Sequence, residues 1–130
     1  MQVKTALEVA SALIPVQEIV CRVYKITLEQ LHEKTRMPKI SEPRQISMCI
    51  GAKIIHLSTL SLGRHYDVTH SNVCHANKKT WNLYLFDRSF RSRINYIAEI
   101  MGFNPDQLRP RDPEPHLFVI KIKRGRKKSV

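Results

Sequence analysis

The chain has 130 residues, of which 42% are hydrophobic and 25% are charged, which is the size and composition of one globular domain. Its 22 Lys and Arg residues outnumber 11 Asp and Glu residues, and the net charge of +11 favours a polyanionic partner, either nucleic acid or an anionic membrane surface. No apolar run exceeds five residues, which excludes a membrane span, and no phosphate-binding glycine loop occurs, which excludes a nucleotide-binding loop. The three cysteines form no C-x-x-C pair, which excludes a disulfide scaffold and favours a cytoplasmic protein.

The first third of the chain is expected to hold three helices and a basic loop. Apolar residues at helical spacing predict one helix over residues 3–14 and a second over 15–24, because the proline at 15 suits the first turn of a helix better than its interior. Thr27 is expected to cap a short helix over 28–31. The basic loop, residues 34–39, follows.

The middle of the chain is expected to hold two further helices. Ser41, Glu42 and Pro43 predict a helix start, because they supply a hydroxyl cap, a first-turn acid and a proline. Ser58 is expected to cap a short helix that ends at Leu62, and residues 63–67 are expected to form a turn.

Two longer helices are predicted next. The first is capped by Thr69 and runs from His70 to about Leu85, and the second starts at Asp87 and stops at Gly102. The inner face predicted for the first of these helices consists of Val73, Cys74, Trp81 and Tyr84.

These elements together predict an all-α domain over residues 1–103. A proline-containing linker and a short, extended basic tail are expected over 104–130, with a short strand over 117–123. The net charge is −1 over residues 1–33, +8 over 34–93 and +4 over 94–130, so the middle segment is expected to present a basic face.

Two adjacent helices in this most basic segment, joined by a short turn, indicate a helix-turn-helix. Residues 69–72 are short and polar and open the second helix, the position from which base edges are contacted in the major groove. Lys78 and Lys79 lie two turns further on and suit flanking phosphates. The same four residues are equally typical of a simple helix cap.

Residues 69–79, with the sequence THSNVCHANKK, resemble the signature of the C-terminal DNA-binding domain of the bacterial chromosomal replication initiator DnaA family. Residues 43–48 are similar to its proline-arginine-glutamine helix start, and residues 24–31 are similar to its first helix end and short second helix. The resemblance covers about residues 13–100. It implies an all-α helix-turn-helix fold of the DnaA C-terminal or Trp-repressor-like kind that binds double-stranded DNA. It further implies a replication-related role and a location in the bacterial cytoplasm, associated with the nucleoid.

The resemblance also implies roles for individual residues. Arg36 matches a minor-groove arginine of the basic loop, Arg44 and Gln45 match phosphate ligands at a helix N-terminus, and His70 and Ser71 match base-contacting residues. The full predicted DNA-binding set is Arg36, Lys39, Arg44, Gln45, Lys53, Arg64, Thr69, His70, Ser71, Asn72, Lys78 and Lys79.

The sequence departs from the family pattern in two respects. Val68 and Thr69 stand where the family has arginine and aspartate, so the family's target sequence is not expected to carry over. The 130 residues also contain no P-loop, and a stand-alone relative without the ATPase module is therefore expected.

Other interpretations compete with duplex binding. Trp81 and Tyr84 could stack on single-stranded DNA or RNA, although core packing is the commoner role for this spacing. A protein-interaction module that kept the fold without base readout is a further alternative, as is a homodimer through the N-terminal helix. Neither an enzyme nor a bound cofactor is expected, and a metal site at His70, Cys74 and His75 is disfavoured by helical geometry.

Overall fold

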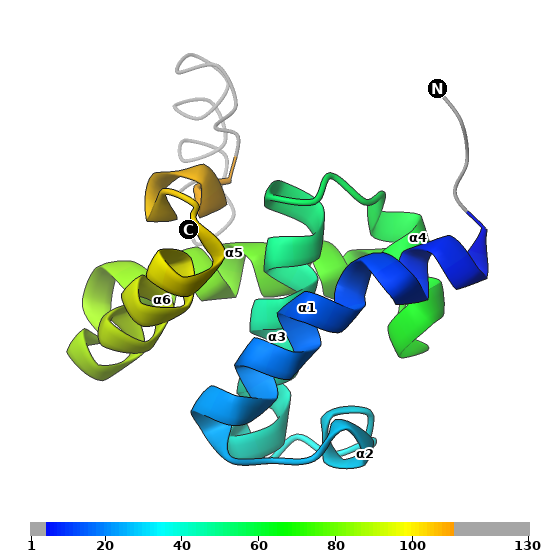
Figure 1. Cartoon of the computed structure of the whole chain (residues 1–130), viewed down its shortest axis with the longest axis horizontal. Coiled ribbons are helices and arrows are strands. Elements are labelled where there is room, and N and C mark those ends of the chain that lie inside the picture. The colour runs from blue at the N-terminus through cyan, green and yellow to red at the C-terminus, as the bar shows by residue number, and fades with distance from the viewer. Residues whose placement is uncertain (1–4, 111–130) are drawn as a thin grey trace, which may run out of the picture.

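A computed structural model describes residues 5–110, and within this range the chain is all-α, as predicted, with six α-helices, one 3-10 helix and no strand (Figure 1). The strand and basic tail predicted beyond residue 110 lie outside the described residues. The elements are α1 (Ala6–Tyr24), α2 (Leu28–Leu31), α3 (Pro38–Lys53), α4 (Thr59–Tyr66), α5 (His70–Phe86), α6 (Arg88–Met101) and the 3-10 helix η1 (Pro105–Leu108).

The first helix is continuous, so the prediction of two helices meeting at Pro15 was wrong. Thr5 caps α1 in a capping box with Glu8, and Pro15 lies in the helix interior. Pro15 and Ser11, whose carbonyl loses its helical donor, are both exposed, so water can satisfy that carbonyl. Buried residues on both sides of the proline, Leu13 and Val16, hold the two halves against one core.

The start of α3 also differs from the prediction, since the helix begins at Pro38 and not at Ser41. Proline at the first helical position has a suitable φ and needs no hydrogen-bond partner for its nitrogen. The Ser41 hydroxyl donates to the Arg36 carbonyl (3.3 Å), which joins the basic loop to the first turns of the helix.

Local caps fix most of the other boundaries as predicted. Thr27, Ser58, Thr69 and Asp87 each accept a backbone N–H with their side chains, and Gly102 ends α6 with a φ of 80°. Helix α4 extends further than predicted, through Tyr66, because the left-handed backbone of its C-cap closes the helix only there. The turn is correspondingly short, residues 67–69.

Two large clusters make the core. One joins α1, α3 and α6 around Ile50, Phe90 and Ile94, and the other joins α1, α3, α4 and α5 around Leu13, Leu62 and Val73. Figure 1 shows α5 passing behind α3, with α4 at one end and α6 at the other. Helix α5 is therefore supported along its length by α3, α4 and α6.

The predicted inner face of α5 is partly corrected. Val73 is fully buried, but Cys74 is partly exposed, and Ala76, Asn77 and Thr80 complete the buried face. Trp81 and Tyr84 pack against the core while remaining half-buried, with their rings stacked at 5.3 Å between centroids. The stretch predicted as linker begins with packed residues, since Leu108 of η1 is fully buried in the first cluster.

Candidate nucleic-acid interface

The helix-turn-helix consists of α4, the turn 67–69 and α5. Asp67 adopts a left-handed conformation with a φ of 56°, and the Val68 N–H donates to the Gly63 carbonyl (2.8 Å), which reverses the chain within three residues. Glycine is required at position 63 because a Cβ there would lie 2.7 Å from the Val68 carbonyl oxygen. The turn is thus held by backbone contacts and sets the direction in which α5 leaves it.

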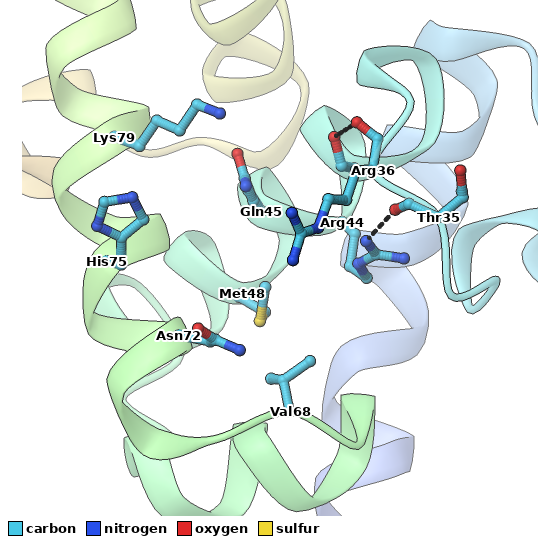
Figure 2. A pocket seen from close by; sticks show the side chains of 10 residues that line it. Thr35, Arg36, Arg44, Gln45, Met48, Val68, Asn72, His75 and Lys79 are labelled. Atoms are coloured by element: carbon cyan, nitrogen blue, oxygen red, sulfur yellow. Dashed lines mark hydrogen bonds between the residues drawn. The ribbon is translucent and has the colours of Figure 1, made fainter.

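A groove of about 550 Å³ runs between the basic loop, α3 and α5 (Figure 2). Arg36 enters from the loop, Gln45 and Met48 form the floor from α3, and Asn72 and Lys79 face it from α5. A second hollow adjoins it toward the turn and shares Arg36, Arg44 and Asn72 with it. The groove is lined by Thr35, Arg36, Ser41, Arg44, Gln45, Met48, Val68, Asn72, His75 and Lys79.

Arg44 is hydrogen-bonded to the basic loop. Its guanidinium donates to the Thr35 carbonyl (2.9 Å) and to the Glu33 carbonyl, and partial burial lowers the pKa of the group from its usual range. Arg44 is the seventh residue of α3, so the prediction that it and Gln45 stand at a helix N-terminus was wrong. Both side chains nevertheless line the groove.

A second contact joins the basic loop to the helix-turn-helix. Lys34 Nζ lies 3.0 Å from Asp67 Oδ2 and also donates to the Asp67 carbonyl. Both side chains are largely exposed, so this ion pair contributes little stability, below about 1 kcal/mol. The contact links the basic loop to the turn that starts α5.

The first turn of α5 divides its side chains between internal and outward roles. Thr69 Oγ1 accepts the Asn72 N–H (3.1 Å), so Thr69 acts as the N-cap. His70 Nδ1 lies 2.6 Å from Thr59 Oγ1, and its Nε2 lies 3.6 Å from Cys74 Sγ, so both ring nitrogens have internal partners. Ser71 and Asn72 are exposed.

The structure brings only part of the predicted set together. Arg36, Arg44, Gln45, Asn72 and Lys79 line the groove, and Thr69 lines the adjoining hollow. Lys78 lies beside it in a hollow with His75 and Trp81, and Lys39, His70 and Ser71 are exposed but line none of these hollows. Lys53 and Arg64 line two other hollows, away from the groove.

The two outlying basic residues belong to other surfaces. Lys53 is the last residue of α3, and it lines a hollow with His56 and Arg109. Arg64 lines a hollow with Ala6 and Val9 on the α1 side of α4. Sequence proximity to the motif did not distinguish these residues from those in the groove.

Five groove residues were missing from the predicted set, and His75 is the one titratable side chain among them; the other four are Thr35, Ser41, Met48 and Val68. His75 is exposed and lines the groove, three residues after Asn72 and four before Lys79. That spacing places the three side chains on one stripe of the helix, which is a signal present in the sequence.

Within residues 5–110, no three His, Cys, Asp or Glu side chains are grouped so as to hold a metal ion. None of the helices in the described part of the chain is long and apolar enough to cross a membrane.

The fold and the groove define a helix-turn-helix protein with a basic concave face. A family model described as the bacterial DnaA protein helix-turn-helix matches residues 15–80, about half of the chain, and the chain therefore belongs to this family. Membership in the family implies DNA binding.

Curated relatives agree with this assignment. The chain is 34% identical over 89 residues to the chromosomal replication initiator protein DnaA of Caldanaerobacter subterraneus subsp. tengcongensis, and 36% identical over 89 residues to that of Thermoanaerobacter sp. (strain X514). The DnaA of Desulfotalea psychrophila is 27% identical over 84 residues. The matches cover 65–68% of this chain but only 18–20% of those relatives, so the chain spans about a fifth of their length.

Proposed function

We propose that the chain binds double-stranded DNA with the outward face of α5 in the major groove and the basic loop at the adjacent minor groove. The observation that carries this proposal is the groove itself, where Arg36, Arg44, Gln45, Asn72 and Lys79 converge from three separate segments. A major groove about 12 Å wide admits one helix, and side chains that flank the helix then face phosphates. We further propose that the DNA sites are replication-related, as the relatives' name suggests.

Base readout in this proposal rests on Asn72, with Ser71 and His75 beside it. An asparagine amide can bond adenine at two positions, and Asn72 is exposed in the first turn of α5. His70, which the resemblance implied as a base-contacting residue, has both ring nitrogens close to Thr59 and Cys74. We assign it to holding the two helices together.

Phosphate contacts in this proposal come from the exposed basic side chains around α5. Lys78 and Lys79 lie two turns after the base-contacting residues, and Arg36 lies across the groove from Lys79 (Figure 2). Arg44 supports this interface by holding the carbonyls of the loop that presents Arg36.

The aromatic pair does not favour a single-strand binder. The rings of Trp81 and Tyr84 stack on each other with an interplanar angle of 15°, and the Arg109 guanidinium lies over the Trp81 ring. A base could stack on them only after displacing these contacts.

The homodimer through α1 stays a prediction: Leu7 and Ile14 are exposed, whereas Val9 and Leu13 are buried in the domain's own core.

The test is selection of bound duplexes from random sequence, with Asn72→Ala and the matched control Asn82→Ala. Asn82 is exposed on the same helix but does not line the groove. We expect Asn72→Ala to relax the preference at one base pair by roughly 1–3 kcal/mol and Asn82→Ala to leave it unchanged. Affinity should fall with salt: the slope of log K against log salt concentration should be about −5 for about six phosphate contacts. A flat salt response, or tighter binding of single strands, would contradict the proposal.

A further inference from the structure

His75 differs from most of the other histidines that the structure describes. The rings of His32 and His65 pack against Tyr66, and His70 has both ring nitrogens beside partners on α4 and α5. The His75 ring is exposed, and within residues 5–110 it makes no hydrogen bond, ion pair or ring contact. Both of its nitrogens are therefore available to a ligand that enters the groove.

His75 lies on α5 between the residue proposed to contact bases and a residue proposed to contact phosphates. It follows Asn72 by one turn and precedes Lys79 by one turn, so the Cβ atoms of neighbours in this stripe are about 5–6 Å apart. Figure 2 shows the His75 and Lys79 side chains on successive turns of α5, and these two residues line both the groove and the hollow beside Trp81. A phosphate that contacts Lys79 at the wall of the major groove is therefore within reach of the His75 ring.

Every charged side chain that lines these two hollows is positive. Arg36 comes from the basic loop and Arg44 from α3. Lys78 and Lys79 come from α5, and none of the described side chains that line either hollow is acidic. The groove thus offers no carboxylate to a protonated His75, whereas a duplex supplies phosphate oxygens. A protonated imidazole donates a charge-assisted hydrogen bond to such an oxygen, and a neutral ring donates a weaker one, so a bound duplex favours the protonated ring.

We propose that His75 takes up a proton from solvent when the chain binds duplex DNA and, as a cation, donates a hydrogen bond to a backbone phosphate. Histidine is the side chain that ordinarily changes charge between about pH 5 and 8, so the proton acts as a second ligand of the interface in this range. The inference rests on the proposed duplex binding and deepens it by making its affinity depend on pH, while Asn72 still carries the base preference. Because linked equilibria are reciprocal, the same coupling makes a lower pH strengthen DNA binding.

The sign and size of the effect follow from the phosphate partner. The protonated ring has this partner only in the complex, so the added affinity is present at low pH and is lost as the pH rises. A hydrogen bond to a charged group changes a binding constant by about tenfold or more. We therefore expect binding to be about tenfold tighter at about pH 5.5 than at about pH 8.

The experiment measures the affinity for the selected duplex and its salt dependence at about pH 5.5 and at about pH 8. Two variants hold the charge at position 75 constant, because glutamine in His75→Gln is always neutral and lysine in His75→Lys stays positive across this range. His56→Asn is the matched control: His56 is exposed, lines a different hollow and has a φ of 66°, which asparagine tolerates. The melting temperature of each variant without DNA, at both pH values, checks that the fold is kept. Calorimetry in two buffers with different ionisation enthalpies counts the protons that binding takes up.

For the unaltered chain and His56→Asn, we expect the tenfold pH effect, net proton uptake and a salt slope steeper by about 0.9 at the lower pH. His75→Gln should lose most of the pH effect and keep the shallower slope, and His75→Lys should show the steeper slope even at the higher pH. The same pH dependence in His75→Gln as in the unaltered chain, or the shallower slope for His75→Lys, would overturn the inference. Asn72-dependent base preference would then leave the proposed function intact, whereas absence of duplex binding at both pH values would overturn both.

Discussion

Replacing Gly63 by alanine tests whether the turn between α4 and α5 positions the DNA-binding helix. A Cβ at position 63 would lie 2.7 Å from the Val68 carbonyl oxygen, 3.5 Å from the Thr69 carbonyl carbon and 3.6 Å from the His70 nitrogen. The closest of these atoms belongs to the backbone, so no side-chain rotation relieves the contact. The turn itself must move, and the start of α5 moves with it.

Two opposing effects decide the size of the stability change. Alanine within a helix is favoured over glycine by about 1 kcal/mol. Relieving an overpacked contact costs about 1–3 kcal/mol, and a backbone contact belongs at the upper end of that range. We therefore expect the free energy of unfolding to fall by about 1–2 kcal/mol, which for a domain of this size lowers the melting temperature by about 5–10 °C.

DNA binding should weaken as well, independently of the loss of stability. Losing the alignment of one base contact costs about 1–3 kcal/mol, so we expect affinity for a selected duplex to fall about tenfold or more, measured well below the melting temperature. Gly102→Ala is the control: its φ of 80° makes alanine unfavourable by about 1–2 kcal/mol, but nothing lies within 4 Å of the new Cβ. If Gly63→Ala binds DNA as tightly as Gly102→Ala does, the turn does not set the position of α5.

Three further perturbations follow from the site. Thr69→Ala removes the acceptor for the Asn72 N–H, and denaturant titration should show a loss of about 1 kcal/mol that Thr69→Ser does not show; equal stability of the two variants would contradict the capping role. Arg44→Gln removes both guanidinium bonds to the loop, and we expect weaker DNA binding with an almost unchanged salt slope; a slope reduced by about one unit would instead identify Arg44 as a phosphate ligand. Burial, followed by the charge of His32, lowers the pKa of His65, so the folded state binds fewer protons than the unfolded state in mild acid. The contribution of neutral His65 to the free energy of unfolding should therefore be fully present above about pH 6.5, and it should be lost as the pH falls toward the lowered pKa. In denaturation curves, His65→Gln should reduce this loss of stability in acid. An identical loss in the variant would exclude His65 as its source.

Local sequence signals predicted the ends of most elements. Thr27 and Ser58 cap their helices as expected, because each hydroxyl accepts an N–H only three residues away. Asp87, which was expected to start the last long helix, is its N-cap for the same reason. Gly102 ends α6 for a similarly local reason, since its left-handed conformation suits glycine. The all-α fold and the family were likewise predicted, because helical periodicity and the motif in residues 69–79 are contained in short stretches of sequence.

Two of the misplaced boundaries, at α1 and α3, involve prolines, whose effect depends on what surrounds them. Pro15 was expected to divide a helix, but packing on both sides of it keeps α1 whole. Pro43 was expected near a helix start, yet the helix begins at Pro38, and buried Pro43 lies in its second turn. Core contacts outweighed local preference in both cases.

The sequence by itself determined the helix caps, the helix-turn-helix motif and the concentration of positive charge around it, because these depend on neighbours a few residues apart. Only the tertiary structure decided which basic side chains share a surface. Lys34 meets Asp67 across 33 residues of chain, Arg109 meets Trp81 across 28, and Lys53 faces the C-terminal end and not the groove. Such pairs follow from how α3, α5 and η1 pack, and packing depends on the whole core at once.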